Sequence, residues 1–347
     1  MIKVAICGDV HWSTYSSIIR KRGRKFSYRL ERLIKSVNWF EKLAKDQGCT
    51  DEIFLGDTFD KPDLSAEEMT ALQEIKWNNL SKYFLVGNHE SNINTLEYSS
   101  TKFFESINAN VISAPTTLSI TDEIDFHLIP YIKTDDILSI SDYIENKEKK
   151  NIVFAHQDLA GLQYGKFVSK TGFSIEDILN NCDLFFDGHL HNEQVIGDKI
   201  ILTGILSGQN FNEDAFKYRH LVYILTIDDE NNVSIESFTN PEAFNFYKLK
   251  IECENDFELL KELKNHAVVS IICEESLIPA VNKLIKSNKK IVESRLMVYY
   301  NYIYDSSEGI TQTILVDDYT KQFITLAQSK LMPSSILDNE LARLGGD

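Results

Sequence analysis

The sequence predicts an α/β protein whose functional residues gather at one rim, formed by the carboxyl ends of several strands. Five short apolar segments have the pattern of buried strands, and each is followed within a few residues by aspartate, asparagine or histidine. Segments with the apolar spacing of helices lie between strands. Open α/β sheets place their ligands beyond the carboxyl ends of their strands, so these polar residues are candidates for one shared site.

The five strands deliver a mixed set of oxygen and imidazole side chains. In chain order they are residues 2–7 followed by Asp9 and His11, residues 52–55 followed by Asp57 and Asp60, residues 83–86 followed by Asn88, His89 and Glu90, residues 151–155 followed by His156, and residues 184–186 followed by His189 and His191. One such motif alone indicates little, because an isolated histidine is usually an ordinary hydrogen-bonded residue. Five motifs, each after an apolar strand, are hard to obtain by accident.

The composition is that of an ordinary soluble globular protein. Apolar residues make up 43% and charged residues 25% of the 347 residues. No apolar run has membrane-spanning length, and the strand that begins at residue 2 leaves no room for a signal peptide. The five cysteines are scattered and form no Cys-x-x-Cys motif, which argues against disulfides and a zinc cluster. We therefore expect a cytoplasmic protein that does not enter a membrane.

The charge distribution bears on nucleic-acid binding in two opposite ways. The net charge of −16 argues against a freestanding nucleic-acid binder, which is usually basic. A basic loop over residues 20–25, however, follows the first motif and leaves the predicted rim. It is either a solvated surface loop or a guide for phosphate groups. In the second case the substrate contacts would come from Arg20, Arg22, Arg24 and Lys25.

The first domain is expected to end near residue 240. Helices are expected at residues 29–46, from Ser65 onward, at residues 95–107, and on the surface within residues 134–149. Further strands are expected at residues 111–112, 126–130, 200–202, 221–225 and 233–235, the last three as an antiparallel group with a hairpin turn at 228–232. His127 lies inside a predicted strand and is interpreted as structural.

Two smaller segments follow the boundary at Asn240-Pro241. Residues 241–305 alternate strands and helices, hold no ligand-like cluster, and predict a small α+β capping domain that is too small to stand alone comfortably. Residues 306–347 are predicted to contain two C-terminal helices, one over residues 314–332 and one from residue 336. Their apolar stripe either folds back on the chain or forms an arm that binds a partner.

The ligand set predicts a pair of metal ions. Two aspartates, one asparagine and four histidines include no thiolate, which disfavours structural zinc and suits Mn²⁺, Fe²⁺ or a catalytic Zn²⁺. Seven side chains are too many for one ion but suit two ions that share a carboxylate, and Asp57 is the candidate for that bridge. Two ions about 3.5–4 Å apart clamp a phosphate and activate water. Phosphoester hydrolysis is therefore the predicted reaction class.

The motifs resemble those of the calcineurin-like metallophosphoesterase superfamily over roughly the first 240 residues. The matching series is Asp9-x-His11, Gly56-Asp57-x-x-Asp60, Gly87-Asn88-His89-Glu90, His156 and Gly188-His189-x-His191. The resemblance implies two facing mixed β-sheets flanked by helices. Within the superfamily, His156-Gln157, the small appended domain and the apolar C-terminal helices are most similar to SbcD-type DNA nucleases, including the recombination endonuclease subunits of tailed phages.

One position departs from the nuclease pattern. Glu90 stands where the nucleases usually have aspartate, a feature shared with protein phosphatases. Those phosphatases, however, follow the central aspartate with Val-Asp-Arg-Gly, whose arginine grips the phosphate. This chain has Phe59-Asp60-Lys61-Pro62 there, so that arginine is missing.

The resemblance also implies a role for each motif residue. It assigns the first metal ion to Asp9, His11, Asp57 and His191, and the second to Asp57, Asn88, His156 and His189. It implies Mn²⁺ as the preferred ion, with Mg²⁺, Fe²⁺ or Zn²⁺ as alternatives. His89 would be a catalytic residue that faces the scissile phosphate and stabilises the leaving oxygen. We expect the carboxylate of Asp60 to orient the His89 ring. Glu90 is a rival for that role, and Asp60 could instead cap the turn at Pro62.

The resulting functional prediction is an Mn²⁺-dependent DNA exonuclease and endonuclease subunit that processes DNA ends in recombination, repair or replication. Its implied partners are DNA and an SbcC-like coiled-coil ATPase, with two copies of this chain in a heterotetramer. For a phage-encoded protein the compartment is the host cytoplasm. One alternative is a stand-alone phosphoesterase for a nucleotide, a phosphoprotein or a lipid headgroup. Another is a non-catalytic scaffold, which is disfavoured because no ligand position is substituted.

Overall fold

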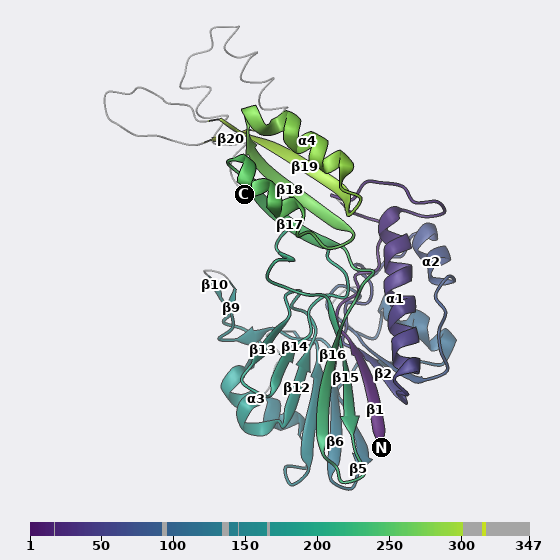
Figure 1. The fold of residues 1–347 in the computed structure, drawn as a ribbon. Coiled ribbons are helices and arrows are strands. Elements are labelled where there is room, and N and C mark those ends of the chain that lie inside the picture. Colours follow the sequence, from purple (N-terminus) through teal and green to yellow (C-terminus); the bar gives the residue numbers. More distant parts are fainter. Residues whose placement is uncertain are drawn as a thin grey trace, which may run out of the picture. The chain divides into compact units, whose positions relative to one another are not determined.

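The chain forms two compact units, Met1–Phe244 and Asn245–Asp347. The computed structural model describes residues 1–16, 18–91, 96–133, 139–144, 146–164, 167–300 and 314–316. Figure 1 shows the first unit as two sheets with helices on their outer sides, and the second unit as a smaller sheet with helix α4. None of the described helices combines the length and the apolar character that crossing a membrane requires.

The first sheet of the larger unit contains three of the five strands that end in motifs. Its order is β16-β15-β1-β2-β3-β4. Strands β1 to β4 run parallel, whereas β15 pairs antiparallel with β1 and with β16. The strands are β1 (Ile2–Cys7), β2 (Asp51–Phe54), β3 (Ser81–Leu85), β4 (Asn110–Ile112), β15 (Leu221–Ile227) and β16 (Val233–Thr239). The expected hairpin between β15 and β16 is confirmed, and Asp228 accepts hydrogen bonds from Asn232 in its turn.

The second sheet contains the other two motif strands. Its order is β13-β14-β12-β7-β6-β5, with β6, β7, β12 and β14 parallel. The strands are β5 (Thr116–Thr121), β6 (Ile124–Ile129), β7 (Lys150–Ala155), β12 (Leu184–Asp187), β13 (Gln194–Ile196) and β14 (Ile200–Leu202). The expectation that residues 200–202 join an antiparallel group with β15 and β16 is wrong. β14 pairs parallel with β12 and antiparallel with β13, because the chain first completes this sheet before it returns to the first one.

Four short strands form two further pairs between β7 and β12. β8 (Leu159–Ala160) pairs with β11 (Phe173–Ser174), and β9 (Gln163–Tyr164) pairs with β10 (Phe167–Val168). All four lie in the segment that connects His156 to His189. No signal for them was found in the sequence.

Alternating side chains on β1 pack in two different cores. Ala5 and Cys7 belong to a cluster that includes Phe40 of helix α1, whereas Val4 and Ile6 belong to a cluster with residues of the second sheet. A third cluster covers the other face of the second sheet and includes Ile178 of helix α3. Three cores separate four layers, so the predicted pair of facing mixed sheets flanked by helices is confirmed.

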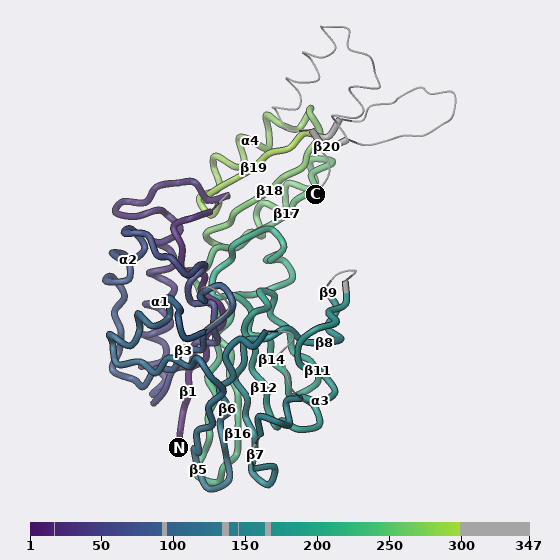
Figure 2. The backbone as a smooth tube through the Cα atoms, turned by 180° about the vertical axis from the view of Figure 1, so that it is seen from behind, coloured from purple at the N-terminus to yellow at the C-terminus, as the bar shows by residue number. Residues whose placement is uncertain are grey.

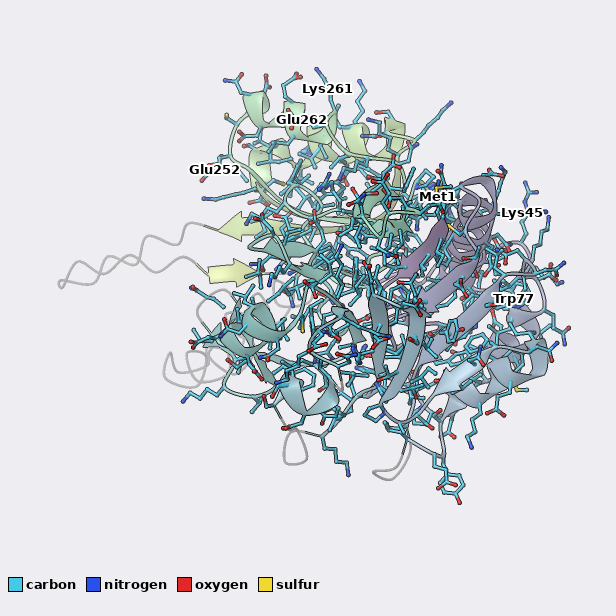
Figure 3. The ribbon with its side chains drawn as sticks, turned by 90° about the horizontal axis from the view of Figure 1, so that it is seen from below. Met1, Lys45, Trp77, Glu252, Lys261 and Glu262 are labelled. Carbon is cyan, nitrogen blue, oxygen red and sulfur yellow. The ribbon has the colours of Figure 1, made fainter. Side chains whose placement is uncertain are left out.

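The flanking helices begin at recognisable caps. Helix α1 (Tyr28–Asp46) starts after Ser27, whose hydroxyl accepts from the backbone N–H of Leu30, and it matches the predicted helix closely. Helix α2 (Ala66–Leu72) begins with a Ser65–Glu68 capping box, and α3 (Ile175–Asn181) lies beside the second sheet. Figure 2 shows α1 and α2 on one side of the unit and α3 on the other. Lys45, near the end of α1, points into solvent (Figure 3).

Two of the other expected helices are short 3₁₀ segments in the described chain. They are η1 (Ser100–Ile107) and η3 (Ile140–Tyr143), each shorter than its predicted range. His127 is structural, as expected, because it is buried in β6 with Nδ1 at 3.1 Å from the Thr117 hydroxyl and Nε2 at 2.8 Å from Asn151 Oδ1.

The second unit is a four-stranded sheet of order β17-β18-β19-β20. Its elements are β17 (Asn245–Ile251), the 3₁₀ segment η4 (Glu254–Leu260), β18 (Ala267–Glu274), the 3₁₀ segment η5 (Glu275–Leu277), α4 (Ile278–Ser287), β19 (Ile291–Tyr300) and β20 (Ile314–Val316). The helix expected from residue 314 is wrong in its first three residues, since β20 pairs antiparallel with the end of β19. The remainder of both predicted C-terminal helices lies outside the described residues.

Candidate metal centre

The five sequence motifs converge at one rim of the larger unit, although they come from two sheets. Asp9 and His11 follow β1, Asp57 follows β2 and Asn88 follows β3, all in the first sheet. His156 follows β7, and His189 and His191 follow β12 in the second sheet. The carboxyl ends of these strands point to the same end of the unit (Figure 1). Each motif thus reaches the site within a few residues of a strand end.

The first metal group contains Asp9, His11 and His191, with Asp57 beside them. Nε2 of His11 lies 3.0 Å from Nε2 of His191 and 3.6 Å from Oδ2 of Asp9. Nε2 of His191 lies 3.7 Å from the same Asp9 oxygen. Oδ2 of Asp57 lies 3.8 Å from Nε2 of His11. Three side chains therefore bring one ligand atom each close together, and Asp57 lies beside His11.

The second metal group contains Asp57, His156 and His189, and Asn88 lies among them. Oδ2 of Asp57 is 3.2 Å from Nε2 of His156. Oδ1 of Asn88 is 3.0 Å from Nε2 of His156 and 3.0 Å from Nδ1 of His189. The same oxygen of Asp57 thus lies within 4 Å of an imidazole nitrogen in each group. This places Asp57 between them, where the sequence predicted a bridging carboxylate.

The donor set fits divalent cations for two reasons. First, Oδ2 of Asp9 is buried without a hydrogen-bond partner, and a buried carboxylate oxygen without a partner is costly. Second, the ring nitrogens of His11 and His191 face each other at 3.0 Å, so both cannot be unprotonated unless a cation lies near them. Oxygen and imidazole donors without thiolate suit Mn²⁺, Fe²⁺ or Zn²⁺. The residues that would hold the two ions are the seven predicted from the sequence.

The family assignment agrees with this geometry. Residues 2–193 match the family described as calcineurin-like phosphoesterase. The chain belongs to that family. It is therefore a metallophosphoesterase, a hydrolase whose family uses two divalent metal ions.

Two solved structures illustrate the similarity at low sequence identity. A dimetal phosphatase from Danio rerio is 14% identical with a TM-score of 0.41, and the match covers 69% of this chain and 99% of that chain. The NAD nucleotidase NadN of Haemophilus influenzae is 13% identical with a TM-score of 0.37, and the match covers 83% of this chain and 59% of that chain. A search of curated proteins found no match.

Strained backbone and close-packed glycines bring the ligands of the phosphoesterase together. His11, Asp57 and His189 all have positive φ angles, of 48°, 43° and 60°, which are uncommon for residues with a side chain. A Cβ atom on Gly87 would lie 2.2 Å from Oδ1 of Asp57, and one on Gly56 would lie 2.5 Å from Nδ1 of His156. Glycine is required at both positions because any larger residue would displace a ligand.

Electrostatics hold the carboxylates of the site ionised. Burial opposes ionisation of Asp57, but the nearby His156 and His11 imidazoles outweigh it and lower the Asp57 pKa. Burial also opposes the charged form of His11 and so lowers its pKa. The neighbouring Asp60 and Asp9 outweigh this effect and raise the His11 pKa to about 10. Asp57 similarly overcomes burial and raises the pKa of His156 to about 10. Divalent cations would therefore displace protons from these imidazoles on binding.

Each imidazole in the two groups has an acceptor near the ring nitrogen that faces away from its group. These are Oδ1 of Asp60 at 3.0 Å from His11 Nδ1, the carbonyl of Leu55 at 2.7 Å from His156 Nδ1, Oε1 of Glu213 at 2.7 Å from His191 Nδ1, and Oδ1 of Asp158 at 3.3 Å from His189 Nε2. Such partners fix the ring orientation and the tautomer of metal ligands. Asp158 and Glu213 were missed in the sequence. Asp158 could have been found by its position two residues after His156, whereas Glu213 lies in no motif.

The predicted pairing of the Asp60 carboxylate with His89 is wrong. Oδ1 of Asp60 lies 3.0 Å from His11 Nδ1 and accepts a hydrogen bond from Gln209, whereas only the backbone carbonyl of Asp60 reaches His89 Nδ1, at 3.1 Å. The turn after Asp57 directs the side chain of Asp60 toward His11. Glu90 does not orient His89 either. It is buried and accepts from the backbone N–H groups of Phe59 and Gly87.

His89 itself lies on the open side of the site. Its side chain is 45% exposed, and Nε2 is 4.0 Å from Oδ2 of Asp57. The Asp60 carbonyl can only accept, so Nδ1 of His89 carries the hydrogen and Nε2 faces the site. The other four histidines of the motifs are candidate metal ligands. His89 is therefore the imidazole that is available to approach a bound phosphate.

The basic loop lines a hollow of about 700 Å³ with Tyr28 and Lys35. Arg24, Lys21, Arg22 and Lys25 all contribute to its wall, and Arg20 is exposed. Arg22 pairs with Glu67, Lys25 pairs with Glu74, and the Lys21 ammonium lies 5.2 Å from the centre of the Tyr28 ring. Among the described residues that line this hollow there is none of the seven ligands. The loop is therefore a cationic surface that is partly neutralised by acidic neighbours.

Proposed function

We propose that this phosphoesterase is a DNA nuclease subunit that hydrolyses phosphodiester bonds with Mn²⁺, in the manner of the SbcD-type nucleases that it resembles. The observation that carries the proposal is the cationic hollow of the basic loop. Five cations (Lys21, Arg22, Arg24, Lys25 and Lys35) line this hollow against two carboxylates (Glu31 and Glu74), which leaves an excess of positive charge where a polyanion can bind on a chain of net charge −16. Lys61 also stands where protein phosphatases have the arginine that grips the phosphate, which distinguishes this chain from them.

The residues divide the chemistry among themselves. When bound, the two ions supply Lewis-acid polarisation of the phosphate and an activated water. Asp9, Asp57, Asn88 and the four ligand histidines would hold and orient that centre. Nδ1 of His89 is held by the Asp60 carbonyl, so in the imidazolium form Nε2 carries the proton that is transferred to the leaving sugar oxygen, and the ring is left neutral. The exposure of His89 leaves room for a substrate strand beside it.

The proposal includes an SbcC-like coiled-coil ATPase as partner, in a heterotetramer that contains two copies of this chain. Such a partner would supply much of the DNA contact that a chain of net charge −16 lacks. The partner-binding arm is proposed at residues 306–347. Truncation after residue 316, which keeps β20, should leave Mn²⁺-dependent cleavage of single strands and abolish co-purification with the ATPase. Full-affinity binding by the truncated chain would refute the arm.

A second candidate is a stand-alone phosphoesterase for a nucleotide, a phosphoprotein or another small phosphoester. The acidic partners of the basic loop favour it, because Glu67 and Glu74 neutralise part of the charge that DNA would need. Under this reading the exposed His89 would serve a small leaving group equally well.

The deciding experiment compares linear DNA with a small chromogenic phosphodiester in the presence of Mn²⁺. A nuclease should cleave both, and Arg24→Ala with Lys35→Ala should weaken DNA cleavage and steepen its loss with salt while leaving hydrolysis of the small ester unchanged. Lys45→Ala, on the exposed end of α1, is the matched control. Hydrolysis of the ester without any DNA cleavage, even with the ATPase present, would select the stand-alone phosphoesterase.

A further inference from the structure

Glu213 lies beyond the region that matches the family and contacts a metal ligand directly. The match ends at residue 193, and Glu213 belongs to the segment between β14 and β15. Its side chain is 2% exposed, and Oε1 lies 2.7 Å from Nδ1 of His191. A buried carboxylate is costly unless donors surround it. Burial of Glu213 therefore requires hydrogen-bond donors around its carboxylate.

Donors from its own segment surround the Glu213 carboxylate. The backbone N–H groups of Gln209 and Asn210 donate to Oε2, and the side-chain amide of Asn210 donates to Oε1 at 2.8 Å. These contacts leave Oε1 aimed at His191, so the turn over residues 209–213 fixes the direction of the carboxylate before any ligand binds. The same turn reaches the other imidazole of the first metal group. Gln209 donates through Nε2 to Oδ1 of Asp60 at 3.0 Å, and that oxygen lies 3.0 Å from His11 Nδ1.

We propose that Glu213 is a positioning residue for the first metal ion. It holds the hydrogen of His191 on Nδ1, which leaves the lone pair of Nε2 directed at the ion beside Asp9. Gln209 joins Glu213 to Asp60, so one turn orients both imidazoles of the first metal group. Within the described part of the chain no equivalent turn serves the second metal group, since His156 is held by a backbone carbonyl and His189 by the half-buried Asp158. The inference rests on the two-metal centre and not on DNA as substrate.

A carboxylate behind an imidazole does more than a neutral acceptor. It fixes the ring and increases the electron density on the ligating nitrogen, and removal of such a partner typically costs 10–100-fold in metal affinity. Glu213→Gln should therefore weaken binding of one Mn²⁺ ion by about 10–100-fold and leave the other unchanged. A residue that only closes the 209–213 turn would instead lower the melting temperature and weaken both ions together or neither.

The binding test uses the full chain, stripped of metal with a chelator and titrated with MnCl₂ in a calorimeter. Asp214→Asn is the matched control, because it removes the neighbouring negative charge, whose carboxylate pairs with Lys217 on the surface. It should retain the wild-type affinities. Gln209→Ala removes only the link to Asp60 and should weaken the same ion by less than Glu213→Gln does. Wild-type affinity for both ions in folded Glu213→Gln would overturn the proposal.

The tautomer of His191 in the wild-type protein provides a second test, and it does not depend on how the Glu213 and Gln209 variants fold. With ¹⁵N-labelled histidine and diamagnetic Zn²⁺, long-range ¹⁵N–¹H spectra report which ring nitrogen carries the hydrogen, and the His191 signals are assigned by their absence from His191→Gln. The proposal requires a protonated Nδ1 and a metal-bound Nε2. A hydrogen on Nε2, or Nδ1 as the metal-bound atom, would overturn it whatever the variants show. If the wild-type protein shows this tautomer but does not cleave DNA, only the proposed nuclease function is contradicted.

Discussion

The two ends of strands β2 and β3 both bury charge, but they balance it differently. At the amino ends, Nζ of Lys82 lies 2.8 Å from Glu52 and 3.3 Å from Glu41, and all three side chains are nearly inaccessible. At the carboxyl ends, Asp57 is equally buried, yet its ion-pair partners among the described residues are all histidines. The ion-pair partners of Asp9 among the described residues are also all histidines, and one of its oxygens has no hydrogen-bond partner.

The difference separates a structural charge cluster from a binding site. The Lys82 cluster contains its own permanent cation, which lies within ion-pair distance of both carboxylates. The rim contains carboxylates and imidazoles that lose their protons to become ligands, so it takes its positive charge from solution. Burial alone therefore does not identify a functional charge cluster, whereas several buried carboxylates and imidazoles that converge without a built-in cation indicate one. Four predictions test this contrast.

The largest effect is expected at the bridge. Asp57→Asn keeps the shape of the side chain but removes the charge that both metal groups share, so both ions should bind far more weakly. Activity on a small phosphodiester should fall by at least about 10³-fold. Metal content by mass spectrometry and the initial rate measure this. Asp125→Asn, which removes a buried carboxylate paired with Lys149, should change neither. A metal-loaded, active Asp57→Asn variant would refute the bridging role.

His89 tests whether proximity to the rim is enough to make a ligand. His89→Ala should retain both ions, because none of the seven ligand side chains is removed. The rate should fall by about 10²–10⁴-fold through loss of the proton donor. The check is a single preparation measured for both metal content and rate. If the ions are lost with the rate, His89 belongs to the ligand set and its catalytic assignment is wrong.

Lys82 tests the closed cluster. Lys82→Met keeps the length of the side chain and leaves Glu41 and Glu52 buried without their cation, which should cost about 3–5 kcal/mol of unfolding free energy. Urea unfolding measures the loss, and Mn²⁺ affinity should not change. Lys42→Met removes an exposed partner of Asp46 and should cost at most about 1 kcal/mol. Equal losses in the two variants would show that Lys82 does not compensate buried charge.

The smallest effect is a pH dependence of stability at the same cluster. Burial, together with the neighbouring Glu52, raises the pKa of Glu41 to about 8, against an ordinary value of 4.5. The folded protein then holds a proton that the unfolded chain releases, so this contribution is fully present below about pH 4.5 and is lost as pH rises toward 8. Urea midpoints at several pH values, with Mn²⁺ at saturation, should show a decline for the wild type that Glu41→Gln lacks. Parallel curves would contradict the raised pKa.

The sequence was sufficient to predict that the candidate ligands lie together, because their placement is local. Each follows a strand within a few residues, and parallel strands of one layer end at a common edge. Gly56 and Gly87 belong to the sequence motifs, although only the structure shows that a Cβ atom there would meet a ligand. The facing sheets followed from the family resemblance, whereas the pairing of β14 with β12 could not be predicted from a short apolar run.

What the sequence by itself determined is therefore the set of candidate ligands that share one rim and the phosphoesterase reaction class. The tertiary structure decided which acceptor holds which imidazole: Asp60 behind His11 and not His89, Asp158 behind His189, and Glu213 behind His191. The physical reason is one of range. A ligand placed by a strand end depends on the few residues after that strand. A carboxylate acts on any imidazole about 3 Å away, and that distance depends on the paths of loops that are remote in the sequence.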